Sequence, residues 1–300
     1  MKVVLLAGGF GGARMARALA ETDVELTVIA NVGDDEEILT LHISPDIDSI
    51  VYALAGIADD ERGWGRRDET WNALETVARL GDETWFQLGD RDLGLHLVRT
   101  RALRAFVPLS RVTARITERL GIEATILPAT DDRLRTWVDT SAGTFPFQEW
   151  YVGRQHRDEV TGVRYEGDAD PAPGVLEALA AADVIAIAPS NPYLSIGPVL
   201  AVNGIRAAIE QRRVPSIAVS PLIGGRTVKG PGAEMIDRFE GGTTPHQVTQ
   251  CYKGLIDRLV VDEADGVDGD RFIVTRTLMG DAEGRRRVAE AVLEAAAVPR

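Results

Sequence analysis

The chain has 300 residues, of which 45% are hydrophobic and 26% charged, and its formal net charge is −13. This composition is typical of a globular protein and excludes a disordered, collagen-like or disulfide-rich chain. The negative charge disfavours nonspecific attraction to nucleic acid or anionic membranes, so any phosphate ligand must be captured locally.

Cys251 is the single cysteine, which excludes an intramolecular disulfide and disfavours a zinc site. No apolar run approaches the length of a membrane span, and residues 1–7 are too short for a signal sequence. We therefore expect a cytoplasmic protein that binds neither nucleic acid nor membranes.

The chain opens with a strand, a glycine-rich turn and a helix. Residues 2–7 predict a buried strand, GGFGG follows at residues 8–12, residues 13–20 have a helical pattern, and residues 26–30 predict a second strand. GGFGG matches neither GxGxxG nor the Walker motif, so it indicates either a phosphate-binding loop or a tight turn without a ligand.

The middle of the chain predicts a layer of helices, followed by a small β excursion. The expected helices are residues 50–57, 68–80, 92–106 and 110–120, with Asp68 and Ser110 as N-caps. Residues 85–88 resemble a short strand, residues 124–128 predict another, and residues 145–168 lack a helical period. We expect one α/β domain, residues 1–300, with a small subdomain inserted at residues 131–170.

The last third returns to alternating strands and helices. Expected helices are residues 174–182, 199–211, 244–259 and 281–297, and expected strands are residues 184–188, 216–219 and 272–275. The whole order predicts a Rossmann-like, doubly wound, mostly parallel sheet. Four loops after predicted strands carry glycine, small polar or charged residues, namely 8–12, 31–35, 190–195 and 220–229, and such loops converge at one edge of the sheet.

Residues 30–50 hold four aspartates in two pairs. Asp34 and Asp35 follow the second strand, whereas Asp46 and Asp48 flank Ile47. An extended backbone would point the second pair to one side, whereas a helix starting after Pro45 would splay it. Carboxylates repel a phosphate ligand, but a divalent cation bound between them would bridge the two. The structural alternative is that Asp46 and Asp48 are helix-start acids favoured by the macrodipole.

Seven segments resemble the 2-phospho-L-lactate transferases, which act late in the biosynthesis of the deazaflavin coenzyme F420. They are GGFGGAR (8–14), NVGDD (31–35), HISPDIDSI (42–50), GWGRRDETW (63–71), LGDRDL (88–93), SNPYLSIGP (190–198) and SPLIGGRTVKGP (220–231). The resemblance covers residues 1 to about 229 and is weaker beyond.

The resemblance implies an enzyme of EC class 2 and its substrates. A phospholactyl or phosphoenolpyruvyl group would move from a GDP-linked donor to the ribityl hydroxyl of the deazaflavin Fo, with release of GMP. Such a transfer depends on positioning and on neutralising charge, so Mg²⁺ is the expected cofactor. The sequence is compatible with either three-carbon acid, because a pocket that selects between lactate and enolpyruvate needs only a few contacts to do so. The resemblance also suggests a homodimer.

The resemblance assigns roles to matching positions. Asp48 and Asp46 are the expected catalytic residues, with Asp48 at the acceptor hydroxyl or the metal. Expected metal ligands are Asp34, Asp35 and Asp48. Expected Fo contacts are Asp48, Arg91 and His42, although a packed or capping histidine is an equal interpretation of His42. Expected contacts to the nucleotide donor are Gly8, Gly9, Gly11, Gly12, Asn31, Ser190, Asn191, Ser195, Arg226 and Lys229.

Two other classes of protein share part of this pattern. A UDP-sugar-binding regulator of the same fold would keep the glycine loop, but we expect a different acidic segment in place of SPDIDSI. A nicotinamide-dependent oxidoreductase is less consistent with the sequence. The GxGxxG spacing is broken, and no acid is evident for the ribose.

Overall fold

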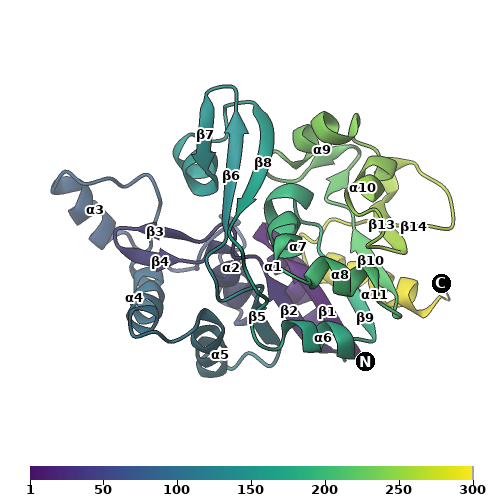
Figure 1. The fold of residues 1–300 in the computed structure, drawn as a ribbon, viewed down its shortest axis with the longest axis horizontal. Helices are drawn as coiled ribbons and strands as arrows, with labels where there is room; N and C mark the ends of the chain where they lie inside the picture. The colour runs from purple at the N-terminus through teal and green to yellow at the C-terminus, as the bar shows by residue number, and fades with distance from the viewer. Residues whose placement is uncertain (299–300) are drawn as a thin grey trace.

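A seven-stranded parallel sheet forms the centre of the computed structural model, which describes residues 1–298 (Figure 1). The strand order is β14-β13-β10-β9-β1-β2-β5, and all neighbouring strands are parallel. The strands are β1 (Lys2–Ala7), β2 (Glu25–Ala30), β5 (Thr125–Pro128), β9 (Val184–Ile187), β10 (Ser216–Val219), β13 (Arg258–Asp262) and β14 (Phe272–Thr275). The predicted α/β class is confirmed.

Helices cover both faces of this sheet. On β1, Val3 and Leu5 belong to one buried cluster and Val4 and Leu6 to the other, because side chains alternate along a strand. One face is covered by α1 (Gly9–Ala20), α2 (Pro45–Leu54) and α11 (Ala282–Ala297). The other is covered by α6 (Val175–Ala181), α7 (Gly197–Ala201), α8 (Ile205–Glu210), α9 (Gly232–Glu240) and α10 (Pro245–Cys251). Burial on both faces explains why the strands are continuous apolar runs.

The strand order reverses beside β1. From β1 the chain moves outward to β2 and β5, and after the middle segment it returns to β9 on the other side of β1 and moves outward again. In open α/β sheets, ligands bind outside the carboxyl ends of strands at such a switch point. The loops after β1 and β9 therefore flank the position where a ligand is expected.

Two groups of elements extend from the sheet (Figure 1). The first contains the hairpin β3 (Glu36–Ile38) and β4 (Leu41–Ile43) with α3 (Asn72–Arg79), α4 (Asp90–Arg104) and α5 (Leu109–Arg119). The second is an antiparallel sheet of β7 (Gly143–Pro146), β6 (Arg135–Thr140) and β8 (Val160–Glu166), with the π-helical turn η1 (Glu149–Gly153). The predicted β excursion thus exists, but its first strand precedes residue 145. Its status as a subdomain stays a prediction.

Several predicted elements are wrong in type or extent. The predicted helix at 199–211 is split into α7 and α8 at Gly204, whose φ of +80° is left-handed. The predicted helix at 244–259 ends at Cys251, and its last residues begin β13 between β10 and β14. An apolar run such as Leu259–Val261 suits either state when read without its neighbours. Residues 85–88 are not a strand, although Leu88 is buried against the β3–β4 hairpin.

Predicted helix starts were also shifted. α1 begins at Gly9 rather than at residue 13, and α3 begins at Asn72, so Asp68 is not its cap. Ser110 lies inside α5, whose N-cap is Pro108. The turns η2 (Pro192–Ile196) and η3 (Glu263–Asp265) and the short pair β11 (Leu222–Ile223) and β12 (Arg226–Thr227) complete the described structure.

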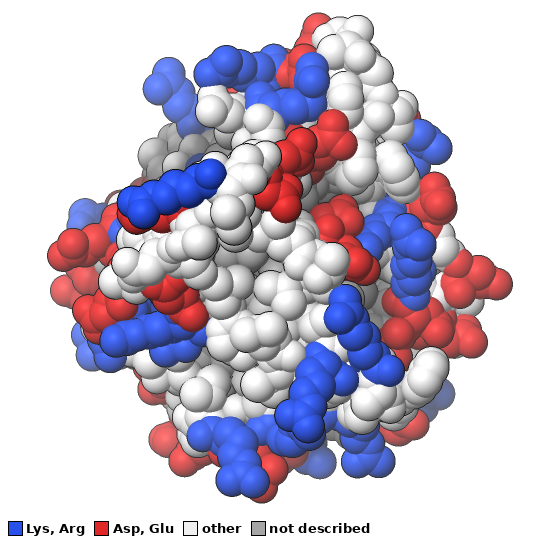
Figure 2. All heavy atoms as spheres, turned by 90° about the vertical axis from the view of Figure 1, so that its left-hand side faces the viewer, with Lys and Arg blue, Asp and Glu red and all other residues white. Residues whose placement is uncertain are grey.

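The surface carries charges of both signs. Acidic and basic side chains surround a largely uncharged centre on the face in Figure 2. Within the described part of the chain, no helix has both the length and the apolar character needed to cross a bilayer.

Candidate active site

A cavity of about 660 Å³ lies at the switch point of the sheet. The loops that follow β1, β2, β9 and β10 contribute to its wall, together with the start of α2 and part of the small β6–β8 lobe. Its volume lies within the range of small-molecule binding sites. The four strand-end loops predicted from the sequence therefore do meet at one cavity.

The glycine loop forms one wall of this cavity because it allows close approach of other segments. A Cβ on Gly11 would lie 2.2 Å from the Pro189 carbonyl oxygen, and a Cβ on Gly8 would lie 2.6 Å from Asp46 Oδ2. The Ser190 hydroxyl donates to the Gly8 carbonyl oxygen at 2.7 Å, which joins the loops after β1 and β9. The backbone amides at the start of α1 are thereby brought to the cavity, where a helix N-terminus favours an anion.

Asp46 and Asp34 form the acidic part of the wall. Asn31 Nδ2 donates to Asp46 Oδ2 at 2.9 Å, and burial raises the pKa of Asp46 to about 6. Burial, reinforced by the charge of Asp46, raises the pKa of Asp34 well above its usual value. Asp34 Oδ1 is buried without a hydrogen-bond partner. Such an oxygen needs a cation or a proton, because an unpaired buried acceptor is costly.

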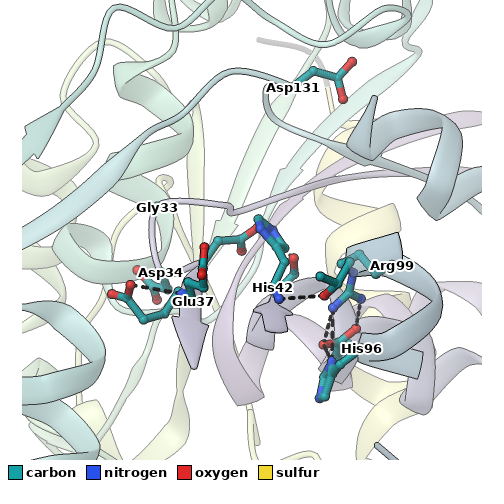
Figure 3. A network of polar contacts seen from close by, with 12 residues as sticks. Gly33, Asp34, Glu37, His42, His96, Arg99 and Asp131 are labelled. Carbon is teal, nitrogen blue, oxygen red and sulfur yellow. Dashed lines mark hydrogen bonds and ion pairs between the residues drawn. The ribbon is translucent and has the colours of Figure 1, made fainter. Parts of the chain in front are cut away.

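Asp48 is held by a buried arginine. Arg99 Nη1 donates to Asp48 Oδ2 at 3.0 Å and Nη2 donates to Oδ1, while Arg99 itself is only 1% exposed. His96 lies beside Arg99 on α4 (Figure 3), with its Nδ1 3.7 Å from Asp48 Oδ2. Burial lowers the pKa of His96 to about 4, so the ring is neutral at neutral pH. Asp48 is therefore a fixed, charge-compensated acceptor.

Asp46 and Asp48 lie at the N-terminal turn of α2, which Pro45 begins. The helical alternative of the sequence analysis is thus confirmed, and it separates the two carboxylates: Asp46 contacts Asn31, and Asp48 contacts Arg99. Both nevertheless line the cavity. The helix-start interpretation is therefore compatible with a place for both residues in the cavity wall, and their catalytic role stays a prediction.

Asp35 belongs to a separate contact behind the wall. His42 Nε2 lies 2.9 Å from Asp35 Oδ2, and the Ser44 hydroxyl donates to the same oxygen at 2.7 Å. None of these three residues lines the cavity. Figure 3 shows His42 on the segment that precedes α2.

Asp92 is a further acid in the cavity wall, and the sequence analysis did not single it out. The Tyr52 hydroxyl donates to its Oδ1, and burial raises the pKa of Asp92 to about 6. Its usual pKa is 3.8, so the folded protein holds this proton over a pH range where the unfolded chain has released it.

We expect Asp92→Asn to change the pH dependence of stability. Stability that comes from the protonated carboxyl is fully present below pH 3.8 and lost as the pH rises through about 6. The variant should therefore become more stable than the wild type across this window, by up to about 3 kcal/mol. Urea unfolding at several pH values measures this difference, and a constant difference would contradict the raised pKa.

Cations and aromatic rings also line the cavity. The guanidinium of Arg14 lies 4.2 Å from the centroid of the Phe10 ring, and Lys229 Nζ lies 5.5 Å from the same centroid. From the small lobe, Tyr151 stacks between Phe147 and His156, with centroid distances of 5.2 and 4.9 Å. All six residues line the cavity, which can therefore accept both an anionic group and a planar ring.

The structure brings together most of the predicted site residues. Those that line the cavity are Gly8, Gly9, Gly11, Asp34, Asp46, Asp48, Ser190, Asn191, Ser195 and Lys229. Gly12 and Asn31 are buried behind the wall, and Asn191 also caps η2 through its side chain. Asp35 and His42 face each other outside the cavity, Arg226 is exposed, and Arg91 lies at a different cavity. The roles of these residues stay predictions.

Sequence reasoning missed Tyr52, Asp92, His96 and Arg99. His96 and Arg99 are three residues apart on a helix, which places them on one face, but the same spacing is common on exposed helices. Only the packing of α4 against the β4 and α2 region reveals that this face is buried.

The donor set fits Mg²⁺ that is partly held by substrate. Within residues 1–298, no three acidic, histidine or cysteine side chains are placed to hold a metal ion by themselves. Mg²⁺ commonly uses one or two carboxylates, with water and substrate phosphates as its other ligands. The unpaired buried oxygen of Asp34, with Asp46 nearby, suits this arrangement. Asp35 Oδ1 is also buried without a partner, but Asp35 does not line the cavity, and Arg99 already engages both oxygens of Asp48.

The fold and the site define a doubly wound α/β protein with an acidic ligand cavity at the switch point of its sheet. The family model described as 2-phospho-L-lactate transferase CofD matches residues 3–293. A phosphoenolpyruvate transferase of Streptomyces griseus is 40% identical over 313 residues, covering 99% of this chain and 98% of that protein. One from Mycobacterium ulcerans is 40% identical over 327 residues and covers 99% of both chains.

The chain belongs to the CofD family of 2-phospho-L-lactate transferases. It is therefore a transferase of the phosphoenolpyruvyl or phospholactyl type in F420 biosynthesis, as the sequence motifs predicted. Among solved structures, a member of the UPF0052 family from Bacillus halodurans shares the fold, with a TM-score of 0.65 and 20% identity. That match covers 98% of this chain and 100% of the other.

Proposed function

We propose that the protein transfers a phosphoenolpyruvyl or phospholactyl group from a GDP-linked donor to the ribityl hydroxyl of Fo. The observation that carries this proposal is one cavity in which buried aspartates face a glycine loop, a lysine and a stack of aromatic rings. Both substrates combine a planar heterocycle with polar groups, and the cavity offers partners for each.

The donor diphosphate would lie against the start of α1. Backbone amides at the glycine loop and the dipole of the helix favour negative charge there, and Lys229 and Arg14 add positive charge at the same wall. This local capture explains how a protein with a net charge of −13 can hold a nucleotide diphosphate.

Asp34 and Asp46 would hold Mg²⁺ together with the donor phosphates. The ion would supply neutralisation of the charge that develops on the diphosphate. Of the metal ligands predicted from the sequence, this assignment retains Asp34. It replaces Asp35 and Asp48 by Asp46, because of the contacts described above.

Asp48 would orient the acceptor hydroxyl. Its carboxylate lines the cavity and is fixed by Arg99, so it can accept a hydrogen bond from the hydroxyl in one geometry. The hydroxyl oxygen bonds to the phosphorus that carries the three-carbon acid, the bond from that phosphorus to the bridging oxygen breaks, GMP leaves, and the hydroxyl proton passes to the departing phosphate or to water. Positioning rather than strong base catalysis is what phosphoryl transfer requires.

The expected products can be identified directly. The protein, Fo and Mg²⁺ are incubated in parallel with the enolpyruvyl and the lactyl form of the GDP-linked donor, and the Fo product is identified by mass. Because two relatives are described as phosphoenolpyruvate transferases, we expect a higher kcat/KM for the enolpyruvyl donor. Absence of an Fo product with either donor would refute the proposal.

We further propose that the protein works in the cytoplasm as a homodimer, as the sequence analysis expected. Light scattering measures the mass of the purified protein in solution, and we expect twice the chain mass of 32.5 kDa. A mass equal to that of one chain would contradict the dimer.

A further inference from the structure

A second cavity, of about 480 Å³, lies outside the active site between α4, α5 and the segment after α2. Its wall is mainly apolar, and four arginines also line it. The apolar residues are Ile57, Leu95, Val98, Ile116 and Leu120, and the arginines are Arg66, Arg91, Arg115 and Arg119. Arg66 and Arg91 come from the GWGRRDETW and LGDRDL motifs, but they do not themselves line the active-site cavity.

These arginines are only weakly paired with acids. Among residues 1–298, no ion pair involves Arg66, Arg115 or Arg119, although the charge of Arg66 acts to lower the pKa of Asp92, and Arg91 pairs with Asp68 at 4.0 Å. The Nε atom of Arg66 is buried without a hydrogen-bond partner. In a chain with a net charge of −13, four such cations around one apolar hollow select for an anion.

The second cavity shares a wall with the active site. Tyr52 borders both cavities, the guanidinium of Arg66 lies 5.7 Å from the centroid of its ring, and its hydroxyl donates to Asp92 in the active-site wall. A ligand in the second cavity would therefore lie against the back of the active site and not inside it.

We propose that the second cavity binds a small amphipathic anion, a molecule with an apolar body and at least two carboxylate or phosphate groups. The volume suits a small molecule, the apolar wall suits its body, and guanidinium groups bind carboxylates and phosphates through paired hydrogen bonds. This binding does not depend on the proposed transfer reaction.

A second copy of this chain is a poorer occupant. A two-fold interface centred on this patch would set these arginines opposite their own copies. Charge complementarity therefore favours an anionic ligand.

The test uses N-dansyl-L-glutamate, a fluorescent probe with an apolar ring system and two carboxylates. Its binding to the full-length protein is measured by fluorescence polarisation. We expect saturable binding to the wild type, weakened at least about tenfold by the double substitution Arg115→Gln and Arg119→Gln, because two charge-assisted contacts are removed. Val98→Glu, which adds an acid at a half-exposed position of the wall, should weaken binding similarly.

The matched control is the double substitution Arg101→Gln and Arg111→Gln. These arginines are exposed on the same two helices and do not line the cavity, so the net charge changes equally. The control should change the affinity by less than about twofold. Equal affinity of the wild type and the cavity variants, equal weakening in the control, or no saturable binding to the wild type would each overturn the proposal.

Discussion

Asp46→Asn should lower the turnover number at saturating substrates by at least about a hundredfold, and it should also raise the melting temperature. Turnover falls because the amide cannot supply the negative charge that the proposed site requires next to Asp34. Stability rises because burial disfavours the charged carboxylate, as the pKa of about 6 shows, and the neutral amide keeps an acceptor for Asn31.

Both quantities can be measured on one preparation at pH 8, by GMP release and by thermal unfolding without metal. Asp131→Asn is the matched control, since Asp131 lies apart from the acids of the site (Figure 3) and accepts two hydrogen bonds from Ser110 at the start of α5. It should leave turnover within about twofold and should not raise the melting temperature. Near-normal turnover of Asp46→Asn would return Asp46 to a purely structural role.

Arg99→Met should lower the free energy of unfolding by about 3–5 kcal/mol, because it leaves the Asp48 carboxylate buried without its partner. The Met side chain fills much of the same space, so the loss reports mainly the uncompensated charge. Turnover should fall as well, since Asp48 loses the contact that fixes its orientation. Urea unfolding and steady-state kinetics measure the two effects.

Arg101→Met provides the comparison for this substitution. Arg101 lies two residues further along α4 and is exposed, so its replacement should change stability by less than about 0.5 kcal/mol. A loss below about 1 kcal/mol for Arg99→Met would show that Asp48 does not carry a buried charge in the folded protein.

The sequence predicted the strands of the central sheet well where apolar runs were bounded by glycine or polar residues. β1, β2, β9 and β14 lie within one residue of their predicted positions. β13 was missed because the predicted helix was continued through Gly254, whose φ is +81°, into the apolar residues that pair with β10 and β14. Long-range pairing overrides local pattern in such cases.

The candidate site was predictable where it follows strand ends, and less so where it depends on packing. Gly8, Asp34 and Ser190 meet at one cavity because they follow β1, β2 and β9, which are parallel neighbours, and Asp46 joins them from the start of α2. By contrast, nothing in the sequence distinguishes Arg99 from the exposed arginines of α4. Its burial results from the way α4 packs on the segment that holds His42 and Asp48.

The most direct measurement is a single-turnover assay of GMP release. Excess protein is mixed with the GDP-linked enolpyruvyl donor and Mg²⁺, with and without Fo, and GMP and the Fo phosphodiester are quantified over time. We predict that one GMP forms for each Fo product, and that release is slow without Fo. Equally fast GMP release without Fo, or no release when Fo is present, would contradict the transfer proposed for this cavity.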